Sequence, residues 1–276
     1  KKFQIKDGIL HLLLNPGKKI IDEQKGWARL KEAVKNTDEL MLSLPDACGP
    51  FKEHWAGQAR NFHHVFSGLN LNGSEIVLDL GSGRCWSTRF FSKKGCYSIG
   101  LDILLPKYVG LLTSDIYISN DNIYFERVCG DMEKLPFRDA IFDLVFISAT
   151  LHHSSNISIP LQEINRVLKQ NGRLVLINES VKGLLRKNIT DCDEIKAGIN
   201  EHSYSLPVYL KEIKKSGFNY DLEFWLGGNN KKIIFINRLL ENIIPLKYID
   251  RFIWRPLKHI RLLLFGDTLN LIARKI

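Results

Sequence analysis

The chain contains the stretch Ile76-Val77-Leu78-Asp79-Leu80-Gly81-Ser82-Gly83, an apolar run that ends in an acid and then turns on two glycines. A second apolar run ends at Asp102, nineteen residues after Gly83. Glycines at a strand-to-helix turn let the backbone approach a ligand closely, and the start of a helix favours negative charge. Because an acid at the tip of the next strand can accept hydrogen bonds from ribose hydroxyls, the two runs predict a nucleoside-binding α/β domain.

Short apolar strands and helices alternate along the rest of the chain. The pattern predicts strands at residues 76–80, 96–101, 123–128, 142–148 and 173–178, with helices at 87–94 and 161–169. It also predicts a strand and turn at 3–14, helices at 18–43, 51–69 and 205–216, and strands at 218–225 and 268–274. Continuous apolar strands that alternate with helices are typical of a parallel sheet buried on both faces, and therefore of the α/β class.

The composition restricts the setting and the partners of the protein. The 276 residues are 45% hydrophobic, enough for a sizeable core, and the formal charge of +9 suits an anionic partner without identifying it. The five cysteines are odd in number and none is spaced Cys-x-x-Cys. We therefore expect neither a disulfide framework nor a zinc site, and a cytoplasmic location. No apolar run reaches the eighteen residues of a membrane span.

The glycine turn fits two classes of cofactor, and the residues that follow it distinguish them. A dinucleotide site usually has a third glycine where this chain has Trp86. Several motifs resemble instead those of the class I S-adenosylmethionine-dependent methyltransferases, in order: Val77–Gly83, Gly100–Asp102, Gly130–Phe137, Phe142–Val145 and Leu161–Leu176. One departure is Cys85, which stands where that family often has a further glycine.

The resemblance implies a Rossmann-like, doubly wound sheet that is mostly parallel, with an antiparallel C-terminal strand and helices on both faces. It also implies S-adenosylmethionine as the cofactor and S-adenosylhomocysteine as the product. In the glycine loop, Gly81, Ser82 and Gly83 would face the methionine part and Asp79 would orient the loop. The other implied contacts are Asp102 with the ribose, Ile103 beside the adenine, Asp131 with the adenine amino group, Gly130 and Met132 next to it, and Ser148 beside the sulfonium.

Candidate bases follow from the chemistry of methyl transfer. This reaction is an in-line displacement in which the protein supplies alignment and desolvation, and a hydroxyl acceptor usually needs a base as well. His152 and His153 follow the strand at 142–148, at the edge where α/β sheets bind ligands, and His202 lies in a polar loop before a helix. We take these three as catalytic candidates, with a pocket-lining or solvated role as the alternative. Their spacing makes no metal motif, so no metal is predicted.

A basic stretch near the C-terminus carries most of the excess charge. Between Gly228 and Ile276 there are ten lysines and arginines but only three acids. Basic and apolar residues recur there at helical spacing, which indicates either an ordinary cap helix, the reading we favour, or a peripheral membrane contact through residues 229–265. Nucleic acid is disfavoured as a partner, because Ser148–Leu151 replaces the Asn/Asp-Pro-Pro-aromatic signature typical of methyltransferases that act on base amines.

These observations divide the chain into four segments. They are an N-terminal strand, turn and helical cap (1–70), a cofactor-binding core (71–228), a basic helical insertion that forms an acceptor lid (229–266) and a final core strand (267–276). Residues 3–13 resemble the tail of a zinc-ribbon module that precedes some bacterial methyltransferases. We predict O-methylation of a small molecule, a saccharide or a lipid-linked glycan intermediate. The alternatives are a non-catalytic cofactor-binding partner protein and an RNA methyltransferase.

Overall fold

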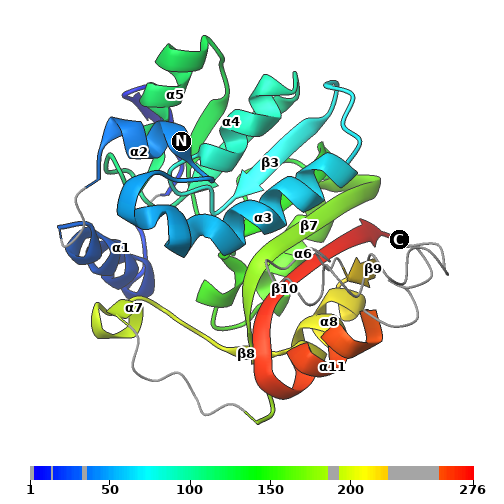
Figure 1. The fold of residues 1–276 in the computed structure, drawn as a ribbon. Helices are drawn as coiled ribbons and strands as arrows, with labels where there is room; N and C mark the ends of the chain where they lie inside the picture. The colour runs from blue at the N-terminus through cyan, green and yellow to red at the C-terminus, as the bar shows by residue number, and fades with distance from the viewer. Residues whose placement is uncertain (1–2, 14, 33–35, 186–192, 223–254) are drawn as a thin grey trace, which may run out of the picture.

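The computed structural model describes residues 3–13, 15–32, 36–185, 193–222 and 255–276 (Figure 1). The chain starts with a hairpin of β1 (Gln4–Lys6) and β2 (Ile9–His11). Asp7 and Gly8 turn it, both with positive φ (52° and 70°), as the Asp-Gly signal in the sequence predicts. β2 then pairs in parallel with β5 (Glu126–Cys129), so the hairpin extends the central sheet.

One sheet runs through the whole described structure. Its strand order is β1-β2-β5-β4-β3-β6-β7-β10-β9, and β8 pairs with β7 off this path. The remaining strands are β3 (Ile76–Leu80), β4 (Tyr97–Asp102), β6 (Phe142–Ser148), β7 (Leu168–Lys182), β8 (Tyr204–Ser205), β9 (Phe218–Leu222) and β10 (Gly266–Lys275). The pairs from β2 to β7 are parallel, whereas β10 is antiparallel to both β7 and β9. The predicted fold class, mostly parallel with an antiparallel C-terminal strand, is confirmed.

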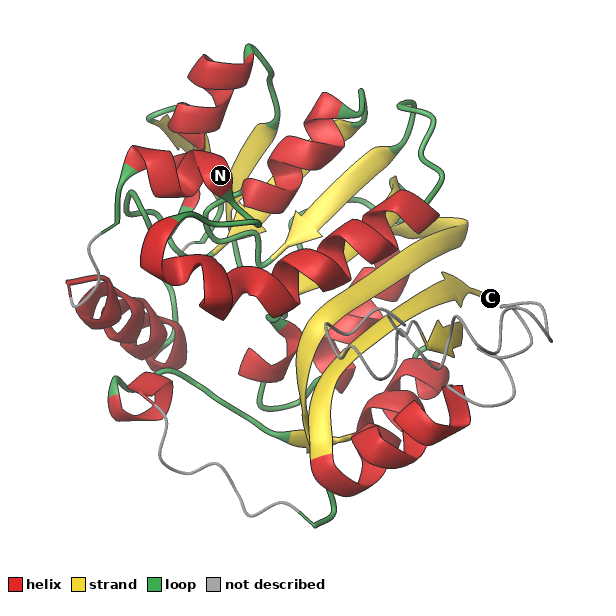
Figure 2. Cartoon of the chain, viewed as in Figure 1, coloured by secondary structure: helices red, strands yellow, loops and turns green. Residues whose placement is uncertain are grey.

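Helices cover both faces of this sheet (Figure 2). One face carries α2 (Asp38–Ser43), α3 (Lys52–Gly68), α4 (Trp86–Lys93) and α5 (Ser114–Asp121), and the other carries α6 (Ser158–Val167), α8 (Leu206–Lys215) and α11 (Arg255–Phe265). Successive side chains of β6 enter the two cores in turn, Val145 on one side and Phe146 on the other. This alternation explains why the strand reads as one continuous apolar run.

Several predicted boundaries differ from the structure, for example the strand expected at 173–178, which extends over 168–182, and two of the helix boundaries have a clear physical reason. The helix expected at 18–43 is two helices, α1 (Lys18–Glu32) and α2, because the Thr37 hydroxyl accepts a hydrogen bond from Leu40 N (3.1 Å) and so caps a new helix. The helix expected to reach Lys169 ends at Val167, since Leu168 is extended, buried and paired with Phe142 at the start of β7.

The basic insertion is described only in part. α11 packs on α8 and β10 through buried Leu262, while Leu257, Ile260 and Phe265 stay exposed. The remainder of the segment predicted to form a lid or a membrane contact, residues 229–254, lies outside the described residues. No helix among the described residues is long and apolar enough to cross a bilayer.

Candidate cofactor and acceptor site

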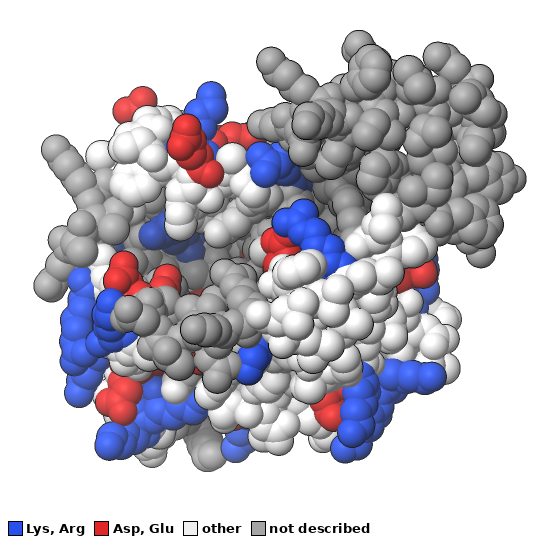
Figure 3. All heavy atoms as spheres, turned by 60° about the horizontal axis from the view of Figure 1, so that its bottom comes forward, with Lys and Arg blue, Asp and Glu red and all other residues white. Residues whose placement is uncertain are grey.

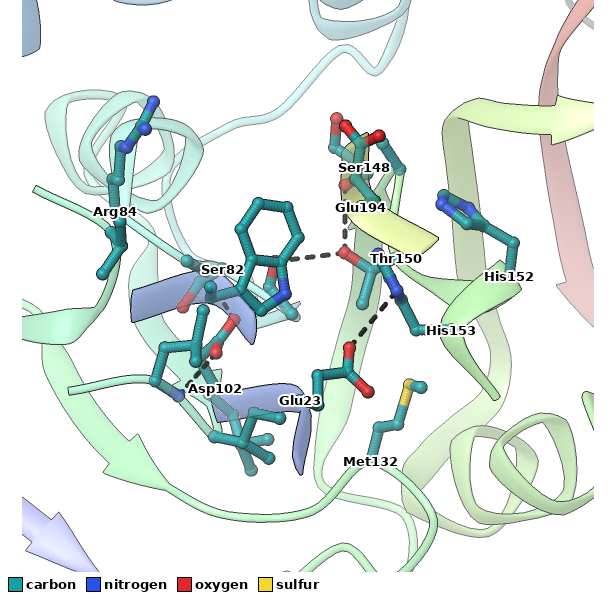
Figure 4. Close-up of a pocket in the computed structure, with 18 of the residues that line it drawn as sticks. Glu23, Ser82, Arg84, Asp102, Met132, Ser148, Thr150, His152, His153 and Glu194 are labelled. Carbon is teal, nitrogen blue, oxygen red and sulfur yellow. Dashed lines mark hydrogen bonds and ion pairs between the residues drawn. The ribbon is translucent and has the colours of Figure 1, made fainter. Parts of the chain in front are cut away.

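A cavity of about 710 Å³ opens at the carboxyl ends of β3, β4 and β6. This is the edge where open α/β sheets bind ligands, and the volume is that of a typical small-molecule pocket. Nine of the ten predicted cofactor residues line it: Gly81, Ser82, Gly83, Asp102, Ile103, Gly130, Asp131, Met132 and Ser148. The structure therefore brings the separate motifs together around one space (Figure 4).

The glycine loop is held against its neighbours by backbone and side-chain contacts. Gly81 N and Ser82 N donate to Leu101 O (2.8 and 3.1 Å), and Thr150 Oγ1 donates to Gly81 O (3.2 Å). Gly81 has a φ of +70°, and a Cβ built on it would lie 2.5 Å from Thr150 Oγ1. A side chain at this position would therefore meet both steric collision and backbone strain.

Asp102 connects the loop to the end of β4. One carboxylate oxygen accepts from Gly83 N and the other from Leu104 N, each at 2.7 Å. Each oxygen keeps a further lone pair for a ligand hydroxyl. Burial raises the pKa of Asp102 to about 6, although the two amides oppose the shift.

Asp79 is the predicted cofactor residue that does not line the cavity. Its buried carboxylate accepts from Ser87 Oγ (2.7 Å) and Thr88 Oγ1 (2.5 Å), and so fastens the start of α4 beneath the loop. Cys85, at the position where the family often has glycine, adopts a φ of +60°. Cys85 therefore adopts the left-handed backbone conformation without being a glycine, and its thiol is buried.

The opposite wall carries the predicted histidines. His152 and His153 lie in a short 3₁₀ helix, η3 (Leu151–His153), directly after β6, and both line the cavity. His152 Nδ1 lies 2.8 Å from Glu179 Oε2, and His153 Nδ1 lies 2.7 Å from Asn200 O. His202, the third candidate, is not among the lining residues, although its backbone N–H donates to His152 O (3.2 Å).

The two lining histidines have opposite pKa shifts. Burial would lower the pKa of His152, but the carboxylates of Glu179 and Glu201 outweigh it and raise the value to about 10. Burial and the neighbouring His152 lower the pKa of His153 to about 4. At neutral pH one ring therefore carries a proton on both nitrogens while the other is neutral.

Sequence reasoning missed the contribution of α1, and from the polar loop after α7 (Asp193–Lys196) it chose His202 as the candidate, whereas Glu201 is the residue of that loop that lines the cavity. Glu23, Trp27 and Glu201 line the wall beside the histidines, and Glu23 Oε1 lies 3.2 Å from His153 Nδ1 (Figure 4). α1 and α7 lie side by side at this edge (Figure 1). No motif marks these residues, because folding alone brings Glu23 and Asn200 together across 177 positions of sequence.

The charge of the cavity is opposite to that of the chain. Six acids line it, against Lys19 and Arg84: Glu23, Asp102, Asp131, Glu133, Glu194 and Glu201. Around the hollow on the face drawn in Figure 3, acidic and basic side chains are interspersed. The wall itself therefore favours neutral or cationic ligands, whatever the net charge of the protein.

Comparison with known proteins agrees with this geometry. Residues 78–176 match the family model described as a methyltransferase domain. The demethylmenaquinone methyltransferase of Tropheryma whipplei (strain Twist) is 31% identical over 160 residues, which are 58% of this chain and 60% of that protein. The enzyme of the same name from Mycobacterium marinum is 34% identical over 113 residues, 40% of this chain and 44% of that protein. The chain thus spans less than two thirds of these relatives.

Solved structures share the fold at low sequence identity. An S-adenosylmethionine-dependent methyltransferase from Mesorhizobium loti superposes with a TM-score of 0.55 at 19% identity, covering 79% of this chain and 98% of that one. Phosphoethanolamine N-methyltransferase 2 of Haemonchus contortus gives 0.57 at 15% identity, covering 90% of this chain and 59% of that one. Residues 78–176 of this chain therefore match a methyltransferase domain, and the described chain shares the fold of these two solved methyltransferases.

Proposed function

We propose that this protein transfers a methyl group from S-adenosylmethionine to a hydroxyl of a small, ring-containing molecule. One observation carries the proposal. A single cavity joins a wall suited to the cofactor, with Gly81 and Asp102, to a wall of aromatic and titratable side chains, with Trp27 and His153. Such an arrangement holds two reactants in one geometry, which is the main demand of a displacement reaction.

The residues present fit the cofactor. Gly81 and Gly83 line the cavity and can present their backbone to the methionine part, and Asp102 retains lone pairs for the ribose hydroxyls. The carboxylate of Asp131, which accepts only from Glu133 N (2.8 Å) among the described contacts, is available to the adenine amino group. The acidic lining complements the sulfonium, which supplies the reactive methyl group when bound.

The chain's own part in the reaction is alignment, desolvation and handling of the acceptor proton. The indoles of Trp27, Trp55 and Trp86 line the cavity and exclude water from its interior. His153, which is neutral, and the Glu23 carboxylate beside it can receive a hydrogen bond from an acceptor hydroxyl. His152, protonated between Glu179 and Glu201, is better suited to orient an acceptor oxygen than to remove its proton.

The lining also favours one class of acceptor. Six carboxylates would repel the phosphates of a nucleic acid, so an RNA substrate is disfavoured despite the basic chain. Aromatic walls suit a flat ring, and the relatives from T. whipplei and M. marinum are named for demethylmenaquinone. A hydroxylated aromatic ring is therefore our first choice, with a saccharide hydroxyl second.

A transfer assay tests this function. Purified protein is incubated with S-adenosylmethionine carrying an isotopically labelled methyl group, together with a demethylated naphthoquinol, an unmethylated saccharide or a structured RNA. We expect one labelled methyl on an oxygen of the quinol, located by fragmentation of the product, and a label on a ring carbon would overturn the hydroxyl acceptor. Labelling of only the RNA would overturn the choice of acceptor. Tight binding of the cofactor without transfer to any acceptor in a cell extract would favour the non-catalytic partner protein.

Asp102 provides the test of the cofactor wall. For Asp102→Ala we expect the affinity for S-adenosylhomocysteine to fall at least about tenfold, or 1.4 kcal/mol, by calorimetric titration, because the ribose hydroxyls lose their acceptor. Asp22→Ala removes the same charge from an exposed position on α1 and should bind as the wild type does. Equal affinity in all three proteins would contradict the assignment.

The raised pKa of Asp102 predicts a pH dependence of this binding. Burial is its main cause, and the neighbouring Glu23 adds to it. Above about pH 6 the carboxylate is ionised and accepts hydroxyl protons, and below that value it becomes protonated. Affinity should therefore be constant from pH 7 to 8 and then weaken toward about tenfold per pH unit below pH 6. Asp102→Asn should bind S-adenosylhomocysteine weakly, with an affinity that depends less on pH. A pH dependence like that of the wild type in this variant would show that titration of Asp102 is not its cause.

A further inference from the structure

Three side chains on the acceptor wall direct their ligand atoms at one point. His152 and Glu201 approach at 3.5 Å (Nε2 to Oε2), and His153 and Glu201 at 3.9 Å (Nε2 to Oε1). The ligand atoms of all three residues lie within 4.8 Å of one another. We propose that His152, His153 and Glu201 form a binding site for a divalent transition metal, with Zn²⁺ as the best match.

The distances are close to those of a zinc site. Tetrahedral zinc with bonds of about 2.0–2.1 Å holds its ligands about 3.3–3.4 Å apart. The two separations of 3.5 and 3.9 Å, measured to different oxygens of Glu201, exceed this spacing by about 0.1–0.6 Å, and the whole set of ligand atoms, which lie within 4.8 Å of one another, would have to close onto the ion by side-chain rotation. Two imidazoles and a carboxylate are also a ligand set that zinc accepts.

The hydrogen bonds of both rings occupy Nδ1 and leave Nε2 facing Glu201. His153 Nδ1 faces Asn200 O at 2.7 Å, and because a carbonyl only accepts, this nitrogen must carry the proton. Glu179 accepts three backbone amides besides His152 Nδ1, so it is ionised and His152 Nδ1 is also a donor. His153 is neutral and presents the lone pair of Nε2 toward Glu201, whereas His152 also carries a proton on Nε2, which a metal must displace to bind there.

These outer contacts are those of a typical metal site. Histidine ligands almost always donate their second nitrogen to a carboxylate or a backbone carbonyl, which fixes the tautomer and the plane of the ring. Glu179 serves His152 in this way and Asn200 O serves His153. Glu179 is fully buried in β7, so its contact with His152 Nδ1 fixes the His152 ring to the sheet.

The charge balance points the same way. The carboxylates of Glu23, Glu179 and Glu201 surround the two rings. The nearby Lys19 ammonium pairs with Glu133 at 3.2 Å instead of with any of them. A dication would offset this excess of negative charge, and the cluster faces the cavity, so water or an acceptor hydroxyl could complete the coordination. Only this last role rests on the proposed methyl transfer.

Metal titration tests the site without cofactor or acceptor. The full chain is stripped with a chelator and titrated with Co²⁺, whose visible absorption reports tetrahedral coordination, and Zn²⁺ is then added in competition. We expect one equivalent of Co²⁺ to bind and to be displaced by Zn²⁺. For Glu201→Gln and His153→Ala we expect at least about tenfold weaker binding and a changed Co²⁺ spectrum.

His63→Ala is the matched control, because His63 is an exposed histidine on α3 that pairs with Asp46 outside the cavity. It should bind metal as the wild type does. Glu201 is partly exposed, so Glu201→Gln should fold, and circular dichroism of the metal-free variants checks this. No tetrahedral Co²⁺ spectrum in the wild type, or equal binding by Glu201→Gln and wild type, would overturn the site. Metal binding without methyl transfer would overturn only the proposed function.

Discussion

Glu179→Ala is expected to lower the free energy of unfolding by about 3–5 kcal/mol, the usual cost of removing one partner of a buried ion pair. The Glu179 carboxylate is fully buried and accepts from Thr150 N (2.8 Å), Leu151 N (2.9 Å) and His152 N (3.2 Å). It also faces His152 Nδ1 at 2.8 Å. Alanine would leave three backbone amides and Nδ1 of the charged His152 ring without the acceptor that they share in the folded protein.

Chemical denaturation of the variant measures this effect, and Glu163→Ala is its comparison. Glu163 also accepts a backbone amide, Leu135 N (2.8 Å), and pairs with Arg166 (2.7 Å), but its side chain is 23% exposed. Water can solvate the groups left behind, so we expect a loss near 1 kcal/mol there. Similar losses in the two variants would mean that burial does not set the cost at Glu179.

The cofactor wall could be predicted because it is local in sequence. Parallel strands bring their carboxyl ends to one edge of the sheet. A residue at the end of any of these strands therefore reaches the same site, regardless of how the intervening helices pack. Asp102, Asp131 and Ser148 therefore reach the cavity with the glycine loop. Asp79 differs because it lies within β3, two residues before Gly81, where its carboxylate accepts from Ser87 and Thr88 of α4 and does not reach the cavity.

The acceptor wall could be predicted only in part: the sequence pointed to His152 and His153, but the rest of the wall depends on contacts between distant segments. Glu23 comes from α1, His153 from η3 and Glu201 from the loop after α7. No residue spacing encodes their approach, and for this reason the sequence predicted no metal site where the structure gathers three ligand atoms. Net charge was equally uninformative, because a chain of +9 encloses a cavity lined mainly by acids.

Gly81→Ala is the other change with a large expected effect. The new Cβ would lie 2.5 Å from Thr150 Oγ1 and 2.7 Å from Thr150 Cβ, in a backbone with φ of +70°. The left-handed conformation costs a residue with a Cβ about 1–2 kcal/mol, and overpacking adds about 1–3 kcal/mol. We therefore expect a loss of about 2–5 kcal/mol in the free energy of unfolding, measured by denaturant titration, together with weakened binding of S-adenosylhomocysteine.

Gly83→Ala separates the two causes. Gly83 also has a positive φ, +48°, but the nearest atom to its Cβ would be Val109 O at 3.7 Å, an ordinary contact. This variant should show the backbone cost alone, about 1–2 kcal/mol. The difference between the two losses then measures the cost of the collision with Thr150. The double variant with Gly81→Ala and Thr150→Ala should recover only part of that cost, because Thr150 Cβ remains. Equal losses in both single variants would mean that the loop moves away from Thr150 without cost, and that Gly81 is needed for its backbone conformation alone.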